Sequence, residues 1–169
     1  MDGVTMHGGS EAPQATTITD EYRLHRRFDR MARLTGDAGM ERLMNSFVVV
    51  FGLGGVGSFT AEALVRSGVG RIRIVDFDDV CVTNTNRQLH AMKGHIGRPK
   101  SQLMGERLRR INPKADVEDI KKFYQAECAD ELLEGHPDFV IDAIDQFTAK
   151  CHLLATCRAR QIPVISCMG

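Results

Sequence analysis

The sequence predicts an α/β fold with a doubly wound, mostly parallel sheet, and two observations lead to this prediction. First, Phe47–Phe51 is an uninterrupted apolar run, which is typical of a parallel strand that is buried on both faces. Second, strand-like and helix-like segments alternate after this run, as they do where helical crossovers connect parallel strands. Glycine follows the apolar run at once, so the first crossover is expected to begin with a tight turn.

The N-terminal part of the chain precedes the regular pattern. Residues 1–19 are rich in Gly, Ser, Thr, Ala and Pro and show no hydrophobic period, so we expect a flexible tail. Residues 22–45 carry apolar side chains at helical spacing, but Gly36 and Gly39 interrupt them, which favours short helical pieces. The chain has 169 residues and is 43% hydrophobic, so residues 20–169 are expected to form one domain.

The remaining elements follow in order from the hydrophobic pattern. Residues 58–67 predict a helix that Gly68 ends, and residues 71–76 predict a second strand that finishes in a carboxylate. Further on, the pattern predicts a helix whose apolar face carries Met104, Leu108 and Ile111, strands over residues 117–123, 139–144 and 163–167, and a helix over residues 147–160.

The composition excludes several classes of protein. Lysine plus arginine number 22 and aspartate plus glutamate also number 22, so the chain has no net positive charge to attract RNA or an anionic membrane. No apolar run approaches the roughly 20 residues that a membrane span needs. The five cysteines are scattered without a C-x-x-C pair, which argues against a disulfide framework or a structural zinc site. We therefore expect a soluble, cytoplasmic protein.

A glycine-rich turn is the first candidate functional feature. Gly52, Gly54 and Gly57 form the pattern G-x-G-x-x-G between the first strand and the next helix. Glycine there lets a phosphate approach the positive end of the helix, as in a Rossmann-like nucleotide-binding domain, although a tight turn alone would also explain the pattern. Asp76 ends the second strand, where a carboxylate accepts hydrogen bonds from the ribose hydroxyls of ATP or of a dinucleotide. These residues leave the choice of cofactor open.

Three polar residues favour ATP over a nicotinamide cofactor. Asn84, Arg87 and Lys100 supply an amide and two cations, which nucleotidyl transfer needs around a polyphosphate and hydride transfer does not. Pro99 suits the first position of a helix, which would place Lys100 in the first turn, near the positive end of the helix dipole. A bound anion would make that position favourable, and an exposed, solvated lysine is the alternative.

Two carboxylates mark the end of a later strand. Asp142 and Asp145 follow an apolar run and reach the edge of the sheet where open α/β folds bind ligands. One of them is a candidate to hold Mg2+ against the phosphates. Asp145 also lies just before the helix over residues 147–160, so capping of that helix is the alternative explanation.

Together these motifs resemble, in order and spacing, the ThiF/MoeB/HesA family of ATP-dependent carboxylate-adenylating enzymes. The resemblance covers residues 26–169 and rests on GLGGVGS at 52–58, VDFD at 75–78, TNTNRQ at 83–88, GRPK at 97–100, RINP at 110–113 and DAID at 142–145. It implies that Asp145 binds Mg2+ and that ATP is bound by Gly52, Gly54, Gly55, Gly57, Asp76, Asp78, Asn84, Arg87 and Lys100.

The resemblance also implies a partner subunit. Arg30, in the motif RFDR, matches an N-terminal arginine that can reach the ATP site of the neighbouring subunit in this family, so a homodimer is expected. The candidate catalytic residues, which together with Mg2+ would neutralise charge on the phosphates, are then Arg30, Arg87, Lys100 and Asp145.

Finer features resemble one branch of the family, the enzymes that dehydrate threonylcarbamoyladenosine in tRNA. They are RLTG at 33–36, NRQLHA at 86–91, DQFTAKC at 145–151 and ISCMG at 165–169. The resemblance implies that the threonyl carboxylate of a modified tRNA attacks ATP and forms an acyl adenylate. A nitrogen of the same side chain would then close a ring and release AMP. The family normally continues beyond the position of Gly169, so the domain over residues 20–169 is expected to be incomplete at its C-terminus.

Three other functions compete with this one. The chain could activate the C-terminus of a sulfur-carrier or ubiquitin-like protein, with a sulfur-transfer protein as partner and with Cys167 as a sulfur carrier. An NAD-dependent oxidoreductase would instead bind a nicotinamide without a need for Mg2+. The third alternative is a module that binds nucleotide or dimerises without catalysis.

Overall fold

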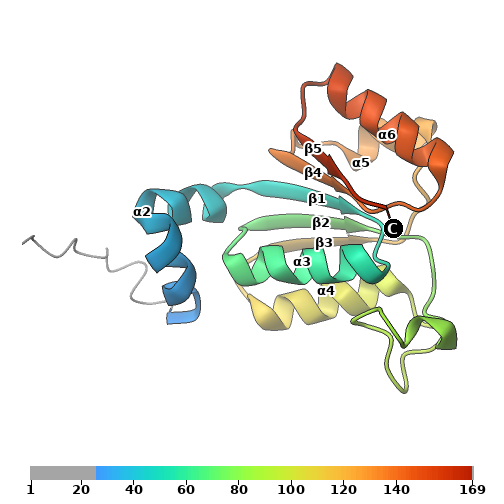
Figure 1. Cartoon of the computed structure of the whole chain (residues 1–169), viewed down its shortest axis with the longest axis horizontal. Helices are drawn as coiled ribbons and strands as arrows, with labels where there is room; N and C mark the ends of the chain where they lie inside the picture. The colour runs from blue at the N-terminus through green and yellow to red at the C-terminus, as the bar shows by residue number, and fades with distance from the viewer. Residues whose placement is uncertain (1–25, 169) are drawn as a thin grey trace, which may run out of the picture.

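The computed structural model describes residues 26–168, so the predicted tail at residues 1–19 lies outside the described part. At its centre is a five-stranded sheet in the order β3-β2-β1-β4-β5 (Figure 1). All neighbouring strands are parallel, and the predicted doubly wound α/β fold is confirmed. The strands are β1 (Phe47–Phe51), β2 (Arg71–Val75), β3 (Asp116–Ile120), β4 (Phe139–Asp142) and β5 (Val164–Ser166).

Helices cover both faces of the sheet. α3 (Gly55–Ser67) and α4 (Lys100–Ile111) lie on one face, and α5 (Ala129–Leu132) and α6 (Phe147–Ala159) lie on the other (Figure 1). The connections between strands and helices also contain two short 3-10 turns, η2 (Val82–Asn84) and η3 (Ala126–Cys128).

β1 contributes to two hydrophobic cores because its side chains alternate between the faces of the sheet. Val48 and Val50 pack in the core that includes residues of α3 and α4. Val49 and Phe51 pack in the core that includes residues of α5 and α6. All five residues of this strand are buried, which explains why the run is apolar throughout instead of alternating with polar residues.

The N-terminal helical segment is interrupted at Gly36, as the sequence predicts, whereas Gly39, also expected to interrupt it, keeps a helical backbone. η1 (Arg26–Phe28) leads into α2 (Asp29–Asn45), and Gly36 interrupts the helical backbone of α2 with φ 68° and ψ 175°. Met40 is fully buried in the second piece of α2. A Cβ at Gly68 would lie 2.9 Å from the Cε of Met40, so this second piece of α2 packs closely on the turn that ends α3.

Some predicted boundaries differ from the observed ones. α3 begins at Gly55 instead of residue 58, because the glycines of the turn adopt helical backbone despite their low helix propensity. β3 ends at Ile120, before the predicted end at residue 123. Leu34, one of the apolar residues at helical spacing in residues 22–45, is 81% exposed instead of packed on the domain. Within residues 26–168, no helix combines the length and the apolar character needed to cross a membrane.

Candidate active site

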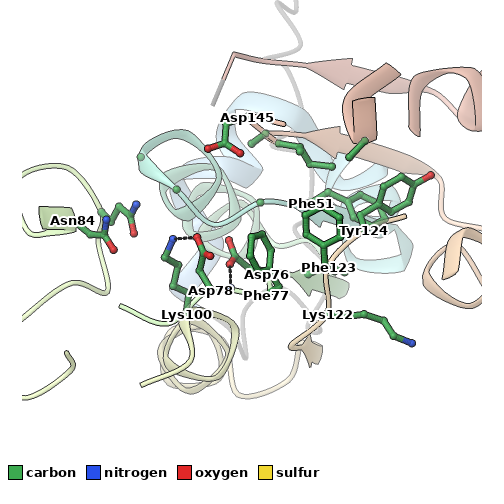
Figure 2. Close-up of a pocket in the computed structure, with 18 of the residues that line it drawn as sticks. Phe51, Asp76, Phe77, Asp78, Asn84, Lys100, Lys122, Phe123, Tyr124 and Asp145 are labelled. Atoms are coloured by element: carbon green, nitrogen blue, oxygen red, sulfur yellow. Dashed lines mark hydrogen bonds and ion pairs between the residues drawn. The ribbon is translucent and has the colours of Figure 1, made fainter. Parts of the chain in front are cut away.

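A cavity of about 250 Å³ lies at the carboxyl ends of the parallel strands. Its walls come from segments that follow β1, β2, β3 and β4 (Figure 2). The crossovers on either side of the β1–β4 pair cover opposite faces of the sheet, and such a switch point is where open α/β sheets bind ligands. Among the residues that line the cavity are the predicted Gly52, Gly54, Gly55, Asp76, Asp78, Asn84, Arg87, Lys100 and Asp145.

The glycines of the turn meet different constraints. Gly52 has a φ of 85°, and a Cβ there would lie 2.5 Å from a main-chain carbonyl oxygen that follows β4. A Cβ at Gly57 would lie 1.8 Å from the carbonyl oxygen of Gly52, so these two glycines build the tight turn. At Gly54 an added Cβ would meet only Gln88 Nε2, at 4.0 Å. Gly54 and Gly55 line the cavity, and the open space beside Gly54 leaves the N-terminus of α3 accessible to a ligand.

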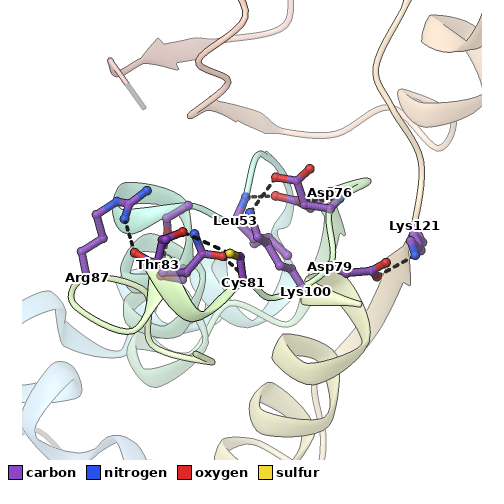
Figure 3. Close-up of polar contacts among 12 residues, drawn as sticks. Leu53, Asp76, Asp79, Cys81, Thr83, Arg87, Lys100 and Lys121 are labelled. Carbon is purple, nitrogen blue, oxygen red and sulfur yellow. Dashed lines mark hydrogen bonds and ion pairs between the residues drawn. The ribbon is translucent and has the colours of Figure 1, made fainter. Parts of the chain in front are cut away.

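Asp76 holds the glycine turn against the end of β2. Its Oδ2 accepts a hydrogen bond from the main-chain N–H of Leu53 at 2.6 Å (Figure 3). Its Oδ1 accepts one from the main-chain N–H of Asp78 at 2.8 Å. Burial raises the pKa of the Asp76 carboxyl above its ordinary value, although the two N–H groups act in the opposite direction. Each carboxylate oxygen has a second lone pair, so Asp76 retains the capacity to accept a ribose hydroxyl.

Lys100 is buried at the start of α4 and is paired with Asp78. Its Nζ lies 2.7 Å from Asp78 Oδ2, and its main-chain N–H donates to the carbonyl oxygen of the same residue (Figure 2). The side chain of Lys100 is 6% exposed and that of Asp78 is 45% exposed. The alternative of a solvated lysine is therefore wrong. Pro99 is the N-cap, one position earlier than predicted, and Lys100 is the first helical residue.

Asn84 and Arg87 approach the glycine turn from the segment between β2 and α4. Asn84 is buried, and its Oδ1 accepts a hydrogen bond from the main-chain N–H of Cys81. This bond occupies the side-chain oxygen and leaves the two N–H donors of the amide for a ligand. Arg87 is exposed, and its Nη1 donates to the carbonyl oxygen of Thr83 at 3.1 Å (Figure 3). Its stem lies over Gly55, where an added Cβ would be 3.4 Å from Arg87 Cγ. Arg87, Lys100 and Lys122 are the cationic side chains among the residues that line the cavity, and Lys122 was not predicted.

Of the two carboxylates near the end of β4, Asp145 lines the cavity. Asp142 is fully buried, and its Oδ2 lies 2.7 Å from Lys150 Nζ. Asp145 is exposed on the cavity side of the loop that leads into α6 (Figure 2). The N-cap of α6 is Gln146, whose side chain accepts a hydrogen bond from the main-chain N–H of Ala149. Capping of α6 therefore does not account for Asp145.

The surroundings of Asp145 fit a divalent cation that arrives with a nucleotide. Among the residues that the structure describes, no group of three or more His, Cys, Asp and Glu side chains is arranged to hold a metal ion. Mg2+ is commonly bound by one or two carboxylates together with phosphate oxygens, and it keeps several waters. A single exposed carboxylate in the cavity wall meets that requirement.

The sequence patterns do not predict two aromatic side chains at the rim of the cavity. Phe77 and Phe123 are 50% and 39% exposed, and their ring centroids lie 4.9 Å apart with an interplanar angle of 82°. Phe77 lies between two predicted site residues, so the motif places it near the site. The motif does not show that its side chain is exposed. Phe123 was expected inside a strand. Exposed aromatic faces of this kind offer an apolar surface to a planar ligand.

Arg30 does not line this cavity. It is exposed on α2, the helix that leads directly into the amino end of β1 (Figure 1). The cavity lies at the carboxyl ends of the strands, and a strand of five residues spans roughly 16 Å. Arg30 and the other candidate catalytic residues therefore lie toward opposite ends of the sheet within one chain.

Comparisons with known proteins identify the family of the chain and its fold. The sequence profile of the ThiF family matches residues 28–169. The chain is 51% identical over 142 residues to the tRNA threonylcarbamoyladenosine dehydratase of Bacillus subtilis and 41% identical over 155 residues to that of Escherichia coli. These alignments cover 84% and 92% of this chain but 56% and 57% of the relatives, so the chain spans little more than half of their length.

A solved structure shows the same fold. The E. coli tRNA N6-threonylcarbamoyladenosine dehydratase TcdA, in complex with ATP, matches with a TM-score of 0.83 and 41% sequence identity. The match covers 89% of this chain and 61% of that chain. From the family profile and these identities, together with the geometry of the cavity, we conclude that the chain belongs to the ThiF family.

Proposed function

We propose that the chain is the nucleotide-binding part of an ATP-dependent dehydratase that acts on threonylcarbamoyladenosine in tRNA. The observation that carries this proposal is the meeting of Arg87, Lys100 and Asp145 with the open N-terminus of α3 around one cavity. Two cations, a helix N-terminus and a carboxylate suited to Mg2+ match a bound triphosphate better than a nicotinamide. The names of the similar curated proteins support the nucleoside substrate.

The lining of the cavity suggests one orientation for ATP. The ribose would bind at Asp76, and the phosphates would lie over Gly54, where the space beside the main chain is open and the helix end is positive. The purine would then extend toward the apolar rim at Phe77 and Phe123. This orientation leads the phosphate chain toward the cationic side chains that line the cavity.

The chemistry requires positioning and charge stabilisation more than a protein nucleophile. The threonyl carboxylate of the modified tRNA would attack the α-phosphorus of ATP and expel pyrophosphate, which leaves an acyl adenylate. A nitrogen of the same side chain would attack the activated carbonyl carbon, so that the ring closes and the former carboxylate oxygen leaves with AMP. Arg87 and Lys100 would stabilise negative charge on the phosphates during the first step. No cysteine is needed, and Cys167, considered for sulfur transfer, is only partly exposed.

Mg2+ would be held by Asp145 together with phosphate oxygens. When bound, it would supply positive charge that lowers the cost of expelling pyrophosphate. Asp145 would orient the phosphates through this ion, while Lys100 and Arg87 would hold them from the side of the β2–α4 connection. This division places the binding groups on two sides of the cavity.

A homodimer would complete the site. Arg30 is exposed and lies away from the cavity of its own chain, so a catalytic role for it would require the cavity of a second copy. The charged helix α2 would then extend from one subunit to the other. This reaction on tRNA would take place in the cytoplasm.

Pyrophosphate exchange tests the proposed function. Labelled pyrophosphate should enter ATP when the chain is given Mg2+ and tRNA that carries threonylcarbamoyladenosine, and unmodified tRNA should not support exchange. Exchange with a sulfur-carrier or ubiquitin-like protein and not with modified tRNA would instead identify a protein-activating enzyme and overturn the assignment. Binding of Mg-ATP without exchange for any acceptor would leave a nucleotide-binding module.

A further inference from the structure

Lys150 forms a buried ion pair behind the cavity. Its Nζ lies 2.7 Å from Asp142 Oδ2, 2.7 Å from the carbonyl oxygen of Cys167 and 3.2 Å from Ser166 Oγ. The side chains of Lys150 and Asp142 are 7% and 0% exposed. One ammonium group therefore connects α6 to the ends of β4 and β5, although the chemistry described above uses neither member of the pair.

The same network fixes the main chain that leads to Asp145. Asp142 Oδ1 accepts a hydrogen bond at 3.0 Å from the main-chain N–H of Ile144, the residue immediately before Asp145. Asp142 Oδ2 also accepts a hydrogen bond from Ser166 Oγ at 2.6 Å. The carbonyl oxygen of Asp142 accepts the main-chain N–H of Cys167 at 2.8 Å. The direction of the loop after β4 thus depends on a carboxylate that Lys150 holds in place.

Stability alone does not account for this ion pair. Burying a lysine and an aspartate sacrifices their hydration, and apolar residues of similar size often serve a protein core equally well. β4 and α6 otherwise contribute apolar side chains to the same layer, among them Val140, Ala149 and Leu153. A buried pair in such surroundings is better explained by the particular conformation that its hydrogen bonds select.

We propose that Lys150 is a positioning residue for Asp145. Through Asp142 and Ile144 it fixes the loop after β4, so that the Asp145 carboxylate faces the place where the nucleotide phosphates and their Mg2+ would lie. This inference rests on the proposed function, because it assigns Lys150 to the Mg-ATP site of that enzyme. A carboxylate that is already oriented loses less freedom when it binds a metal, and removal of such supporting contacts commonly weakens metal binding.

The test compares Lys150→Met and Lys150→Arg with the wild-type chain. Lys150→Met keeps the apolar stem and removes the charge. ATP affinity is measured by calorimetry in EDTA and across a titration of Mg2+. The quantity compared is the Mg2+ concentration at which half of the Mg2+-dependent gain in ATP affinity is reached. In Lys150→Met this concentration should rise on the order of tenfold. The ATP affinity in EDTA should change by less than about twofold. Lys150→Arg, which retains a cation, should recover most of the Mg2+ response.

Matched variants separate positioning from folding. Lys121→Met removes an exposed ammonium that pairs with Asp79 outside the cavity lining, and it should leave the Mg2+ response unchanged. If Lys150→Met does not fold, the double variant Asp142→Asn with Lys150→Met removes both buried charges and should show the same weakened Mg2+ response.

The outcomes distinguish this inference from the proposed function. Equal losses of ATP affinity with and without Mg2+, unrescued by Lys150→Arg, would mean that the pair only supports the fold and would overturn the inference. A wild-type Mg2+ response in Lys150→Met, or in the double variant if that is used, would overturn it as well. If the wild-type chain binds no ATP in a Mg2+-dependent manner, the proposed function itself fails, and the inference fails with it.

Discussion

The ammonium of Lys100 and the carboxylate of Asp78 form an ion pair in the wall of the cavity, with 2.7 Å between Nζ and Oδ2. Lys100 is also the first residue of α4, where the free N–H groups of the helix already concentrate positive charge. Asp78 compensates that charge in the absence of a ligand. Asp78 is the more exposed partner, so its side chain can adjust more readily than that of Lys100 when a triphosphate binds.

Substitution of Lys100 by methionine should weaken binding of ATP far more than binding of AMP. A charge-assisted hydrogen bond contributes about 1.5–3 kcal/mol, so ATP affinity should fall on the order of tenfold to a hundredfold. Calorimetric titrations with both nucleotides measure the difference. Lys114→Met, an exposed change just beyond the other end of α4, is the control. Equal losses for AMP and ATP would show that Lys100 does not act on the terminal phosphates.

Two glycines of the turn should respond differently to alanine. Gly57→Ala places a Cβ 1.8 Å from the carbonyl oxygen of Gly52, so this variant should unfold at a much lower temperature or fail to fold. Gly54→Ala meets no atom closer than 4.0 Å, and it should keep a melting temperature near that of the wild type. Its methyl group should nevertheless weaken ATP binding, because it occupies the space through which phosphate reaches the backbone. Thermal unfolding and ATP titration of both variants check this pair, and ATP affinity unchanged in Gly54→Ala would contradict it.

Mixed dimers test the assignment of Arg30 to a second subunit. Arg30→Ala and Asp145→Ala should each abolish most of the pyrophosphate exchange. When the two variants are mixed and allowed to exchange subunits, random pairing restores one intact site in half of the dimers, so activity should return to about one quarter of the wild-type level. Recovery is measured against each variant alone at the same total concentration. No recovery, despite subunit exchange confirmed by mass spectrometry, would place Arg30 outside the partner's site.

Protonation of His90 should destabilise the fold in mildly acidic solution. His90 is 1% exposed, and burial, assisted by the positive charges of Lys100 and His95, lowers its pKa to about 4. The unfolded chain has an ordinary histidine pKa near 6.5, so between pH 6.5 and 4 the unfolded state binds more protons than the folded one. The free energy of unfolding should therefore fall as pH decreases through this window, by about 3 kcal/mol.

A histidine substitution isolates this contribution. His90→Leu, which keeps a buried side chain of similar size, should flatten the pH dependence of unfolding measured with urea between pH 7 and pH 4. His136→Asn is the control, because His136 is exposed and has a left-handed backbone that asparagine tolerates. An unchanged slope in His90→Leu would mean that other groups cause the acid sensitivity.

The order of elements was predictable where local signals are strong. β1 is wholly apolar because both of its faces are buried, and Gly68 ends α3 in a left-handed conformation with φ 101°. The start of α3 was not predictable from propensity, since Gly55 and Gly57 are poor helix formers. Contacts within the turn, which hold Gly57 against the carbonyl oxygen of Gly52, determine their conformation instead.

The candidate site was predictable as a set of motifs but not as a set of contacts. Asp76, Asn84 and Lys100 lie on different segments, and the structure brings them to one cavity, while their roles in catalysis stay predictions. Phe77 and Phe123 are distant in the sequence, and no local pattern predicts that their rings are in contact at the rim of the cavity. The buried pair of Lys150 with Asp142 escaped prediction because its lysine lies inside a predicted helix, where no local pattern shows that its ammonium is buried against β4.

The reversal of winding between β1 and β4 has a consequence for how the protein would denature. Asp76 and Lys100 lie on segments that connect β2 with β3, in the part of the fold built on β1, β2 and β3. Asp145 follows β4, in the part built on β4 and β5. A nucleotide bound by both parts would act as a non-covalent cross-link across the β1–β4 strand pair. Saturation with Mg-ATP should therefore raise the temperature at which the sheet comes apart between β1 and β4.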